Sequence, residues 1–192
     1  MKDYKVIVDL DSDPVNPRHF DNMGIILAYH RRYSLGDIDK RDRIRNPADG
    51  INGWGEFEQY LRDVERAAVV LPVYMYEHSG IVLSTTPFNC AWDSGRLGLI
   101  FCTNEMIKYE YRVDVITDKE IELATQRLVE EIKDYSAYIS GEVYQYTILE
   151  TQVCNLGHEH QIEIDCCGGY YDKEECERHA EKTLLHIKLR NS

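Results

Sequence analysis

The chain has 192 residues, of which 43% are hydrophobic, and a formal net charge of −12. This length favours a single domain with one main core, and the apolar fraction is sufficient to build it. The acidic balance excludes general, backbone-driven binding of nucleic acid, because such binding needs a cationic surface. The only concentration of basic residues comprises Arg31, Arg32, Lys40, Arg41, Arg43 and Arg45.

Targeting signals and membrane spans are not evident in the sequence. No apolar segment of signal-peptide type follows Met1, and no apolar run approaches the roughly 18 residues that a membrane span needs. We therefore expect a cytoplasmic protein without membrane association. The six cysteines have irregular spacings. In a reducing compartment this pattern predicts free thiols or metal ligands instead of a disulfide framework.

The first third of the chain predicts two strands and a long loop. The segment "YKVIVDL" (4–10) is rich in β-branched residues, which favours a short strand. The nearly continuous apolar run "MGIILAYH" (23–30) predicts a strand that is covered on both faces. Residues 34–53 lack any periodicity and contain many turn formers, so we expect a long loop there.

The middle of the chain predicts a helix followed by short strands. Apolar residues recur at helical spacing from Trp54, and two strands follow that are joined by a tight turn at "HSG" (78–80). Pro72 indicates a free edge or a bulge in the first of these strands. We expect a further strand at 96–103. A brief helix should follow, capped by Thr103 or Asn104 and running through 109. The segment "YRVDVI" (111–116) predicts a short strand.

The last third predicts two helices that flank a pair of strands. Thr117 and Glu120 have the spacing of a capping box, and the helix that they begin should end at Gly141. Strands follow at 142–149 and 160–167, and Asp172 should cap a final helix that frays after 186. Most strands are too close together for crossover helices. We predict an α+β fold with a largely antiparallel sheet and two to four packed helices. We expect one domain over 1–192 with a hairpin-helix extension at about 143–192.

The first candidate site is the polar segment "HRRYSLGD" (30–37), which follows a predicted strand. A guanidinium beside the imidazole of His30 would suit an anion or a phosphate, because arginine offers paired donors. Consecutive residues of a strand point to opposite faces, so only one of Arg31 and Arg32 should share a site with His30. The alternative is structural: one of these arginines pairs with Asp37 and fixes the loop.

The second candidate site is "HSGIVLSTTPFNCAWDSG" (78–95), in which hydroxyl, amide and carboxylate groups surround a tryptophan. The indole of Trp92 would stack on a planar ligand such as a nucleotide while hydroxyls and Asp93 recognise its edge. Alternatively, the polar groups satisfy the backbone of their own loop. A triad of His78, Asp93 and Ser84 or Ser94 can also be written from these residues, but the segment lacks the nucleophile elbow of G-x-S-x-G.

The third candidate site is a cluster of cysteine and histidine residues near the C-terminus. Cys-x3-His and Cys-x2-His resemble paired zinc-ligand spacings, and four nitrogen or sulfur ligands would suffice for zinc. Against this site, two adjacent cysteines of a strand point to opposite faces. We therefore expect no cofactor and keep zinc as an alternative. The candidate ligands are Cys154, His158, His160, Cys166, Cys176 and His179.

Four segments together resemble a family of small, uncharacterised proteins that recur in bacteriophages and mobile elements of low-GC Gram-positive bacteria. They are "DNMGIILAYHRRYSLGD", "YMYEHSGIVLSTTPFNCAWDSGRLGLIF", "YSAYISGEVYQYTI" and "CCGGYYD", within 21–172. The insert "CNLGHEHQIEI" and the residues after 172 are not part of the resemblance. It implies a phage context and a location in the cytoplasm of the bacterial host. It implies no catalytic residues.

Two functional hypotheses follow. The first is a phage-type accessory protein that binds stoichiometrically and counteracts host defence as an anti-CRISPR, anti-restriction or nucleotide-sequestering protein. Its partner would be a host defence protein or a nucleotide-like ligand. The ligand-binding residues would be Arg31, Arg32, Tyr33, Ser84, Thr85, Thr86, Trp92 and Asp93.

The second hypothesis is a small hydrolase or nuclease, metal-assisted or not. Its acid-base groups would be His30, Asp37, His78 and Asp93. We favour the binder because the sequence does not assemble a nucleophile, a base and an orienting group.

Overall fold

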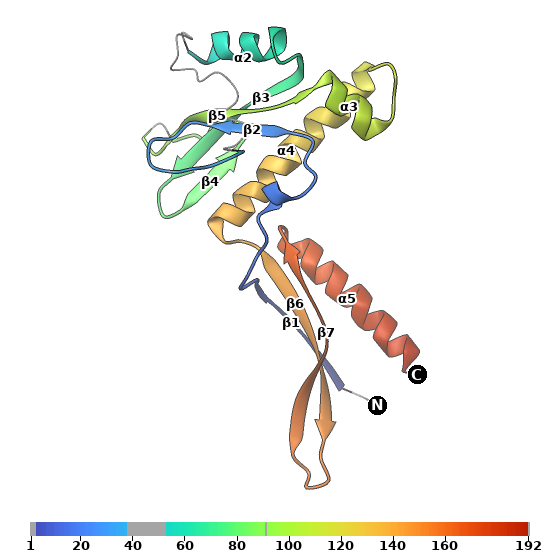
Figure 1. The fold of residues 1–192 in the computed structure, drawn as a ribbon. Helices are drawn as coiled ribbons and strands as arrows, with labels where there is room; N and C mark the ends of the chain where they lie inside the picture. Colours follow the sequence, from blue (N-terminus) through green and yellow to red (C-terminus); the bar gives the residue numbers. More distant parts are fainter. Residues whose placement is uncertain (1–2, 38–52, 91, 192) are drawn as a thin grey trace. The chain divides into compact units, whose positions relative to one another are not determined.

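The structure, a computed structural model, describes residues 3–37, 53–90 and 92–191. It contains four α-helices and two antiparallel sheets in this part of the chain, which confirms the predicted α+β fold. Most of the predicted loop at 34–53 lies outside the described residues. The chain divides into two compact units, which are taken in turn (Figure 1). Unit 1 comprises Met1–Val15 and Ala137–Ser192, and unit 2 comprises Asn16–Ser136.

Unit 2 is built on a four-stranded antiparallel sheet with the order β2-β5-β3-β4. The long strands β3 and β5 pair in its centre, and the register places Leu27 of β2 opposite Leu99 of β5. Pro72 of β3 precedes the residues that pair with β4, and a register shift follows it at Val73. The prediction of a free edge or bulge at Pro72 is therefore confirmed. The strands are β2 (Ile25–Ala28), β3 (Ala67–Glu77), β4 (Ile81–Ser84) and β5 (Ser94–Thr103).

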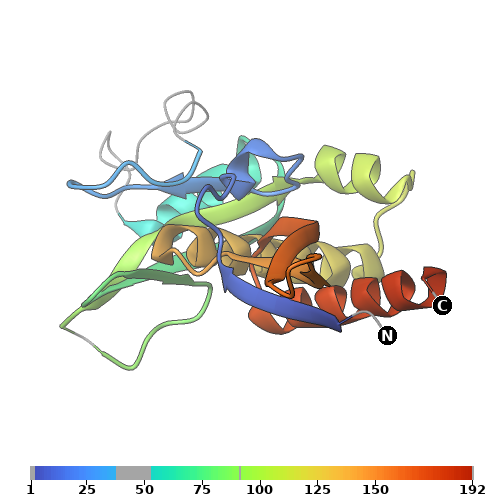
Figure 2. The same cartoon turned by 90° about the horizontal axis from the view of Figure 1, so that it is seen from below.

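Helices cover both faces of this sheet, as Figures 1 and 2 show from two directions. Helix α2 (Trp54–Asp63) places Phe57 and Leu61 against Leu27 and Leu99 on one face. Helix α4 (Asp118–Ser140) contributes Leu128, which lies with Ile100 beside Gly24 on the other face. Because both faces are buried, β2 needs apolar residues at successive positions. This explains the continuous apolar run that the sequence shows there.

The region between β5 and α4 contains one wrong prediction. Helix α3 (Asn104–Tyr111) begins after Thr103, whose side chain accepts a hydrogen bond from the backbone N–H of Met106, as expected. The helix ends at Arg112, which adopts a left-handed conformation with φ 54°. The predicted strand at 111–116 does not form, because the first residue ends the helix and no described strand pairs with the rest.

A buried ionic network ties the ends of β2 to α4. The guanidinium of Arg18, whose side chain is 4% exposed, contacts Asp37 at 2.8 Å and Glu131 at 2.9 Å. Asp37 also accepts from the backbone N–H of Ile26, and Glu131 accepts from the backbone N–H of Gly24. These bonds satisfy the backbone N–H of Gly24, which precedes β2, and that of Ile26 within the strand, so the network fixes β2 and the segment before it.

Unit 1 is a three-stranded antiparallel sheet with the order β1-β6-β7 and one packed helix. Strand β1 (Asp3–Leu10) pairs with β6 (Tyr144–Val153), which pairs with β7 (Glu159–Tyr170). Helix α5 (Lys173–Arg190) begins after Asp172, whose side chain caps it as predicted. It buries Cys176 and Ala180 against Tyr146 and Ile148. The helix continues beyond 186, so the predicted fraying there is wrong.

Candidate ligand-binding pocket

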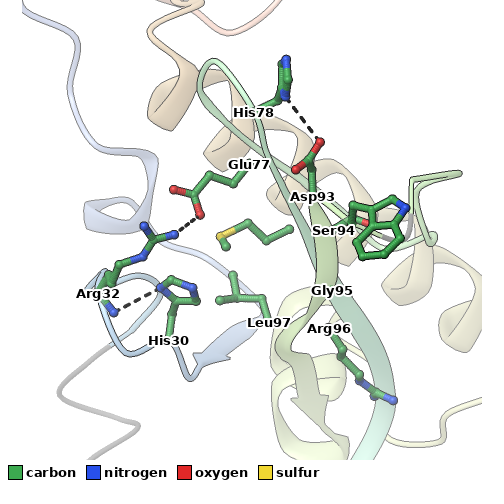
Figure 3. Close-up of a pocket in the computed structure, with 11 residues that line it drawn as sticks. His30, Arg32, Glu77, His78, Asp93, Ser94, Gly95, Arg96 and Leu97 are labelled. Carbon is green, nitrogen blue, oxygen red and sulfur yellow. Dashed lines mark hydrogen bonds and ion pairs between the residues drawn. The ribbon is translucent and has the colours of Figure 1, made fainter.

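A pocket of about 460 Å³ opens at one end of the sheet in unit 2 (Figure 3). It lies among the segment after β2, the turn that ends β3 and the segment that leads into β5. Figure 2 shows the loop between β4 and β5 projecting beyond the strand ends at this part of the sheet. The lining residues are His30, Arg32, Met75, Glu77, His78, Trp92, Asp93, Ser94, Gly95, Arg96 and Leu97.

The segment after β2 forms one wall of the pocket. The rings of His30 and Tyr33 stack at 5.0 Å, and the backbone N–H of Arg32 donates to Nδ1 of His30 at 3.3 Å. The guanidinium of Arg32 lies 2.5 Å from one carboxylate oxygen of Glu77, and the hydroxyl of Tyr33 donates to the other at 2.6 Å. The hydrogen bond to Glu77 raises the pKa of Tyr33. These contacts hold Arg32 at the opening of the pocket.

The opposite wall comes from the ends of β3 and β5. The backbone N–H of Glu77 donates to the carbonyl of Asp93 at 2.8 Å and joins the two strands at this point. Nδ1 of His78 lies 3.4 Å from a carboxylate oxygen of Asp93, and both side chains are well exposed. Trp92 is 96% exposed. Its indole is therefore available to a ligand, because the protein covers almost none of it.

The remaining lining residues connect the pocket to the core. Met75 and Leu97 are buried and make this part of the lining apolar. Arg96 pairs with Glu58 of α2, and its guanidinium lies 5.0 Å from the ring centre of Trp54. Figure 3 shows this guanidinium directed away from His30 and Asp93. Arg96 thus contributes its stem to the pocket and its charge to α2.

The structure brings six of the predicted site residues into one pocket, one of them Ser94 of the candidate triad, and leaves the others outside its lining. His30 and Arg32 from the first motif meet His78, Trp92 and Asp93 from the second. The other predicted ligand-binding residues do not line it; these are Arg31, Tyr33, Ser84, Thr85 and Thr86.

Three of the predicted site residues outside the lining, Ser84, Thr86 and Asp37, make contacts within the fold. Ser84 and Thr86 hydrogen-bond each other at 2.9 Å, as expected for a loop that satisfies its own polar groups. Asp37 lies in the buried network with Arg18. The expected pairing of Asp37 with Arg31 or Arg32 is wrong, because Arg18 contacts Asp37 and Arg32 contacts Glu77.

Sequence reasoning missed Glu77 and Arg18. Glu77 was assigned only to a strand, although its position beside His78 at a strand end placed it next to the second motif. Arg18 carried no local signal, because its partners are 19 and 113 residues away in the sequence. Long-range ion pairs of this kind are not visible in a single sequence.

The arrangement around Asp93 does not match a catalytic triad. In a triad the base lies between the nucleophile and the carboxylate. Here the carboxylate of Asp93 lies between His78, at 3.4 Å, and the thiol of Cys90, at 3.8 Å. The hydroxyl of Ser94 donates to the carbonyl of Cys90. The pocket therefore offers hydrogen-bonding groups and an oriented imidazole, but no activated nucleophile among its described residues.

The six candidate zinc ligands fall into two separate places in unit 1. Cys154, His158 and His160 lie at the tip of the β6–β7 hairpin, and the register places Cys166 about six residues further along the strands. At roughly 3.3 Å per residue, this separation is about 20 Å, so one ion cannot bind all of them. Among the described residues, no group of three or more His, Cys, Asp or Glu side chains is arranged to hold a metal ion.

The sheet separates Cys166 from Cys176 and His179. Cys176 packs on the face that carries Tyr146, and the ring of His179 contacts the same tyrosine. Cys167 is opposite Tyr146 and shares this face, whereas Cys166 is opposite Thr147 and lies on the other. Cys166 therefore cannot join Cys176 and His179 around one ion. The sequence-based expectation that adjacent cysteines point apart is confirmed.

The cysteines should differ strongly in reactivity. Burial raises the pKa of Cys102 and that of Cys176 to about 11, whereas Cys166 and Cys167 are exposed, although the hydrogen bond to Glu163 raises the pKa of Cys166. At pH 8 a thiol with that pKa is roughly 0.1% ionised, so we expect iodoacetamide to modify Cys167 and Cys166 well before Cys102 and Cys176. Peptide mapping by mass spectrometry measures the order, with protein in guanidinium chloride as the control in which all six react. Rapid modification of Cys176 in native protein would contradict the packing of α5.

Comparisons of the chain with protein-family models, with curated proteins and with solved structures give no match. The helices within 3–37, 53–90 and 92–191 include none with the length and apolar character to cross a membrane.

Proposed function

We propose that this chain is a stoichiometric binding protein whose pocket in unit 2 takes a planar, polar ligand of the nucleotide type. The observation that carries the proposal is the meeting of Arg32, His78, Trp92 and Asp93, from two distant sequence motifs, around one cavity of about 460 Å³. This volume lies in the range of roughly 300–1,000 Å³ that small-molecule sites occupy.

The chemistry of the pocket suits each part of such a ligand. The indole of Trp92, 96% exposed, supplies a flat surface for a ring. The side chain of Asp93 is 40% exposed, so its carboxylate can accept hydrogen bonds from the ring N–H or amino groups of a ligand. Arg32 is held by Glu77 with 56% of its side chain exposed, so its guanidinium offers donors to a phosphate.

We further propose that the protein acts as a phage-type accessory protein in the bacterial host, where it counteracts host defence by sequestering a nucleotide-like ligand. The resemblance of the two motifs to proteins of bacteriophages and mobile elements supports this context. A host defence protein is the other partner that the same surface would serve, with Trp92 and Arg32 as the contacts of greatest energy, because tryptophan and arginine dominate protein interfaces.

One observation favours a second candidate function. His78 is oriented by Asp93 and faces the pocket, which is the arrangement of a general base with its carboxylate. A small hydrolase, with or without a metal ion, would use this pair. Binding is the better-supported function because Asp93 separates His78 from Cys90 and no described nucleophile contacts the imidazole.

The first experiment is native mass spectrometry of protein purified from a bacterial host, followed by analysis of any molecule released on denaturation. We expect a nucleotide at a fixed ratio of one per chain. The same nucleotide is then added in excess to the purified protein; its repeated conversion to a product, abolished by His78→Ala, would instead establish the hydrolase.

The binding residues are tested by titrating the protein with the nucleotide that co-purifies. We expect Trp92→Ala to weaken binding by about 5- to 150-fold, which corresponds to the roughly 1–3 kcal/mol that one stacked base contributes. Tyr109→Ala is the matched control, because Tyr109 is an 81% exposed aromatic residue of unit 2 that does not line the pocket. Equal loss of affinity in both variants, or none in either, would contradict the proposed site.

A further inference from the structure

Strand β7 presents an unusually exposed edge in unit 1. It has 12 residues, forms the end of the three-stranded sheet, and is paired only with β6 among the described residues. All of its residues except Asp165 and Tyr170 are exposed. The tip of the β6–β7 hairpin extends past β1, whose Asp3 is opposite Thr151 of β6 (Figure 1). A free edge of this length is a template for another extended segment.

The register assigns the exposed side chains of β7 to two different faces. Ile162 is opposite Glu150, which lies on the same face of β6 as Tyr146 and Ile148, so Ile162 is on the α5 side. Glu159 and Glu163 are opposite Val153 and Leu149 and are therefore on the other face. The outer half of the edge thus has an acidic face and a face that carries Ile162, which is 42% exposed.

We propose that the edge of β7 binds an extended segment of a partner protein that carries Lys or Arg at two positions four residues apart, with apolar residues between them. The charge of the strand supports a basic partner, because "EHQIEIDCCGGY" contains three acidic residues and no Lys or Arg. Opposite charges across neighbouring strands attract, and like charges directly opposite destabilise the pair.

The same charges argue against a second copy of this chain on the edge. If two β7 strands paired in antiparallel fashion about Gln161, Glu159 of each copy would lie opposite Glu163 of the other. No Lys or Arg of the strand would offset this repulsion. A basic strand avoids this repulsion and places a positive charge opposite each of the two carboxylates.

The pattern in the partner follows from the pleat. A residue opposite Glu163 and one opposite Glu159 are four positions apart and share the acidic face, whereas the residue opposite Ile162 points to the α5 side. The segment Lys-Val-Thr-Val-Lys meets all three requirements. It reads the same in both directions, so parallel and antiparallel addition give the same pattern.

The test uses the full-length protein and two labelled peptides, measured by fluorescence anisotropy at pH 7 and low salt. One peptide contains Lys-Val-Thr-Val-Lys, and the control contains Val-Lys-Thr-Lys-Val, which has the same composition but directs its charges to the other face. Two charge pairs across a strand predict that the first peptide binds about 2- to 30-fold more tightly. In the Glu159→Gln/Glu163→Gln protein this difference should vanish.

Backbone pairing is tested separately, because charge alone could attract either peptide. Two further peptides carry N-methyl groups on alternate residues, one on the odd and one on the even positions. Strand addition predicts that one of them binds like the parent and the other does not bind, because only alternate N–H groups face β7. Equal binding of both methylated peptides, equal binding of the two charge patterns, or dimerisation of the protein through β7 at pH 7 would overturn the proposal.

Discussion

Replacement of Arg18 with alanine is expected to lower the free energy of unfolding by about 3 to 5 kcal/mol, the cost typical of removing one partner from a buried ion pair. Arg18 is the shared partner of Asp37 and Glu131, whose side chains are 8% and 4% exposed. Without the guanidinium, two carboxylates remain buried together. Urea denaturation monitored by circular dichroism measures the loss.

The matched control for this change is Arg127→Ala. Arg127 contacts the same carboxylate, that of Glu131, at 3.6 Å, but its side chain is 46% exposed. Arg127 loses little hydration in this contact, and Glu131 keeps Arg18 when Arg127 is removed, so this variant should remain within about 1 kcal/mol of the wild-type stability. Similar losses in the two variants would show that the burial of Arg18 is not what makes its contacts important.

Gly98→Ala is the second substitution with a large expected effect. It should lower the free energy of unfolding by about 3 kcal/mol, which is the upper end of the usual cost of overpacking. Gly98 lies in β5 opposite Ala28, and a methyl group there would meet the carbonyl oxygen of Leu27 at 1.9 Å. The oxygen belongs to the backbone of β2 and cannot rotate away. Strand β2 would have to separate from β5 at this point, so thermal unfolding should begin at a markedly lower temperature.

A glycine in the same strand provides the control for this prediction. A methyl group on Gly95 would meet no atom within 4 Å, so Gly95→Ala should leave the stability nearly unchanged. A loss in Gly95→Ala as large as that in Gly98→Ala would mean that any side chain at these positions is harmful, and that the close approach of β2 is not the cause.

The elements that the sequence predicted well are those whose signals are local. The apolar period of α2, the turn after Glu77 and the cap at Asp172 each depend on residues within a few positions, and each is confirmed. The segment after Tyr111 was misread, because a strand is defined by its partner and its own residues do not show whether a partner exists.

The candidate site was predictable in part for the same reason. Polar residues at strand ends indicated both motifs, and the pairing of β3 with β5 brings the second motif together with Glu77. Asp37 lies outside the pocket with Arg18, which precedes it by 19 residues and joins it only in the folded core, so its location was not visible in the sequence. The sequence alone does not reveal whether a charged side chain will be buried.

The division of unit 1 between the two ends of the sequence has a consequence for biosynthesis. Strand β1 pairs with β6 through contacts such as Tyr4 opposite Glu150, so its partner is translated only after all of unit 2. On the ribosome, β1 therefore has no pairing partner until residues 16–136 and then β6 have emerged. Slow translation of that stretch would lengthen the time during which the nascent chain is open to aggregation.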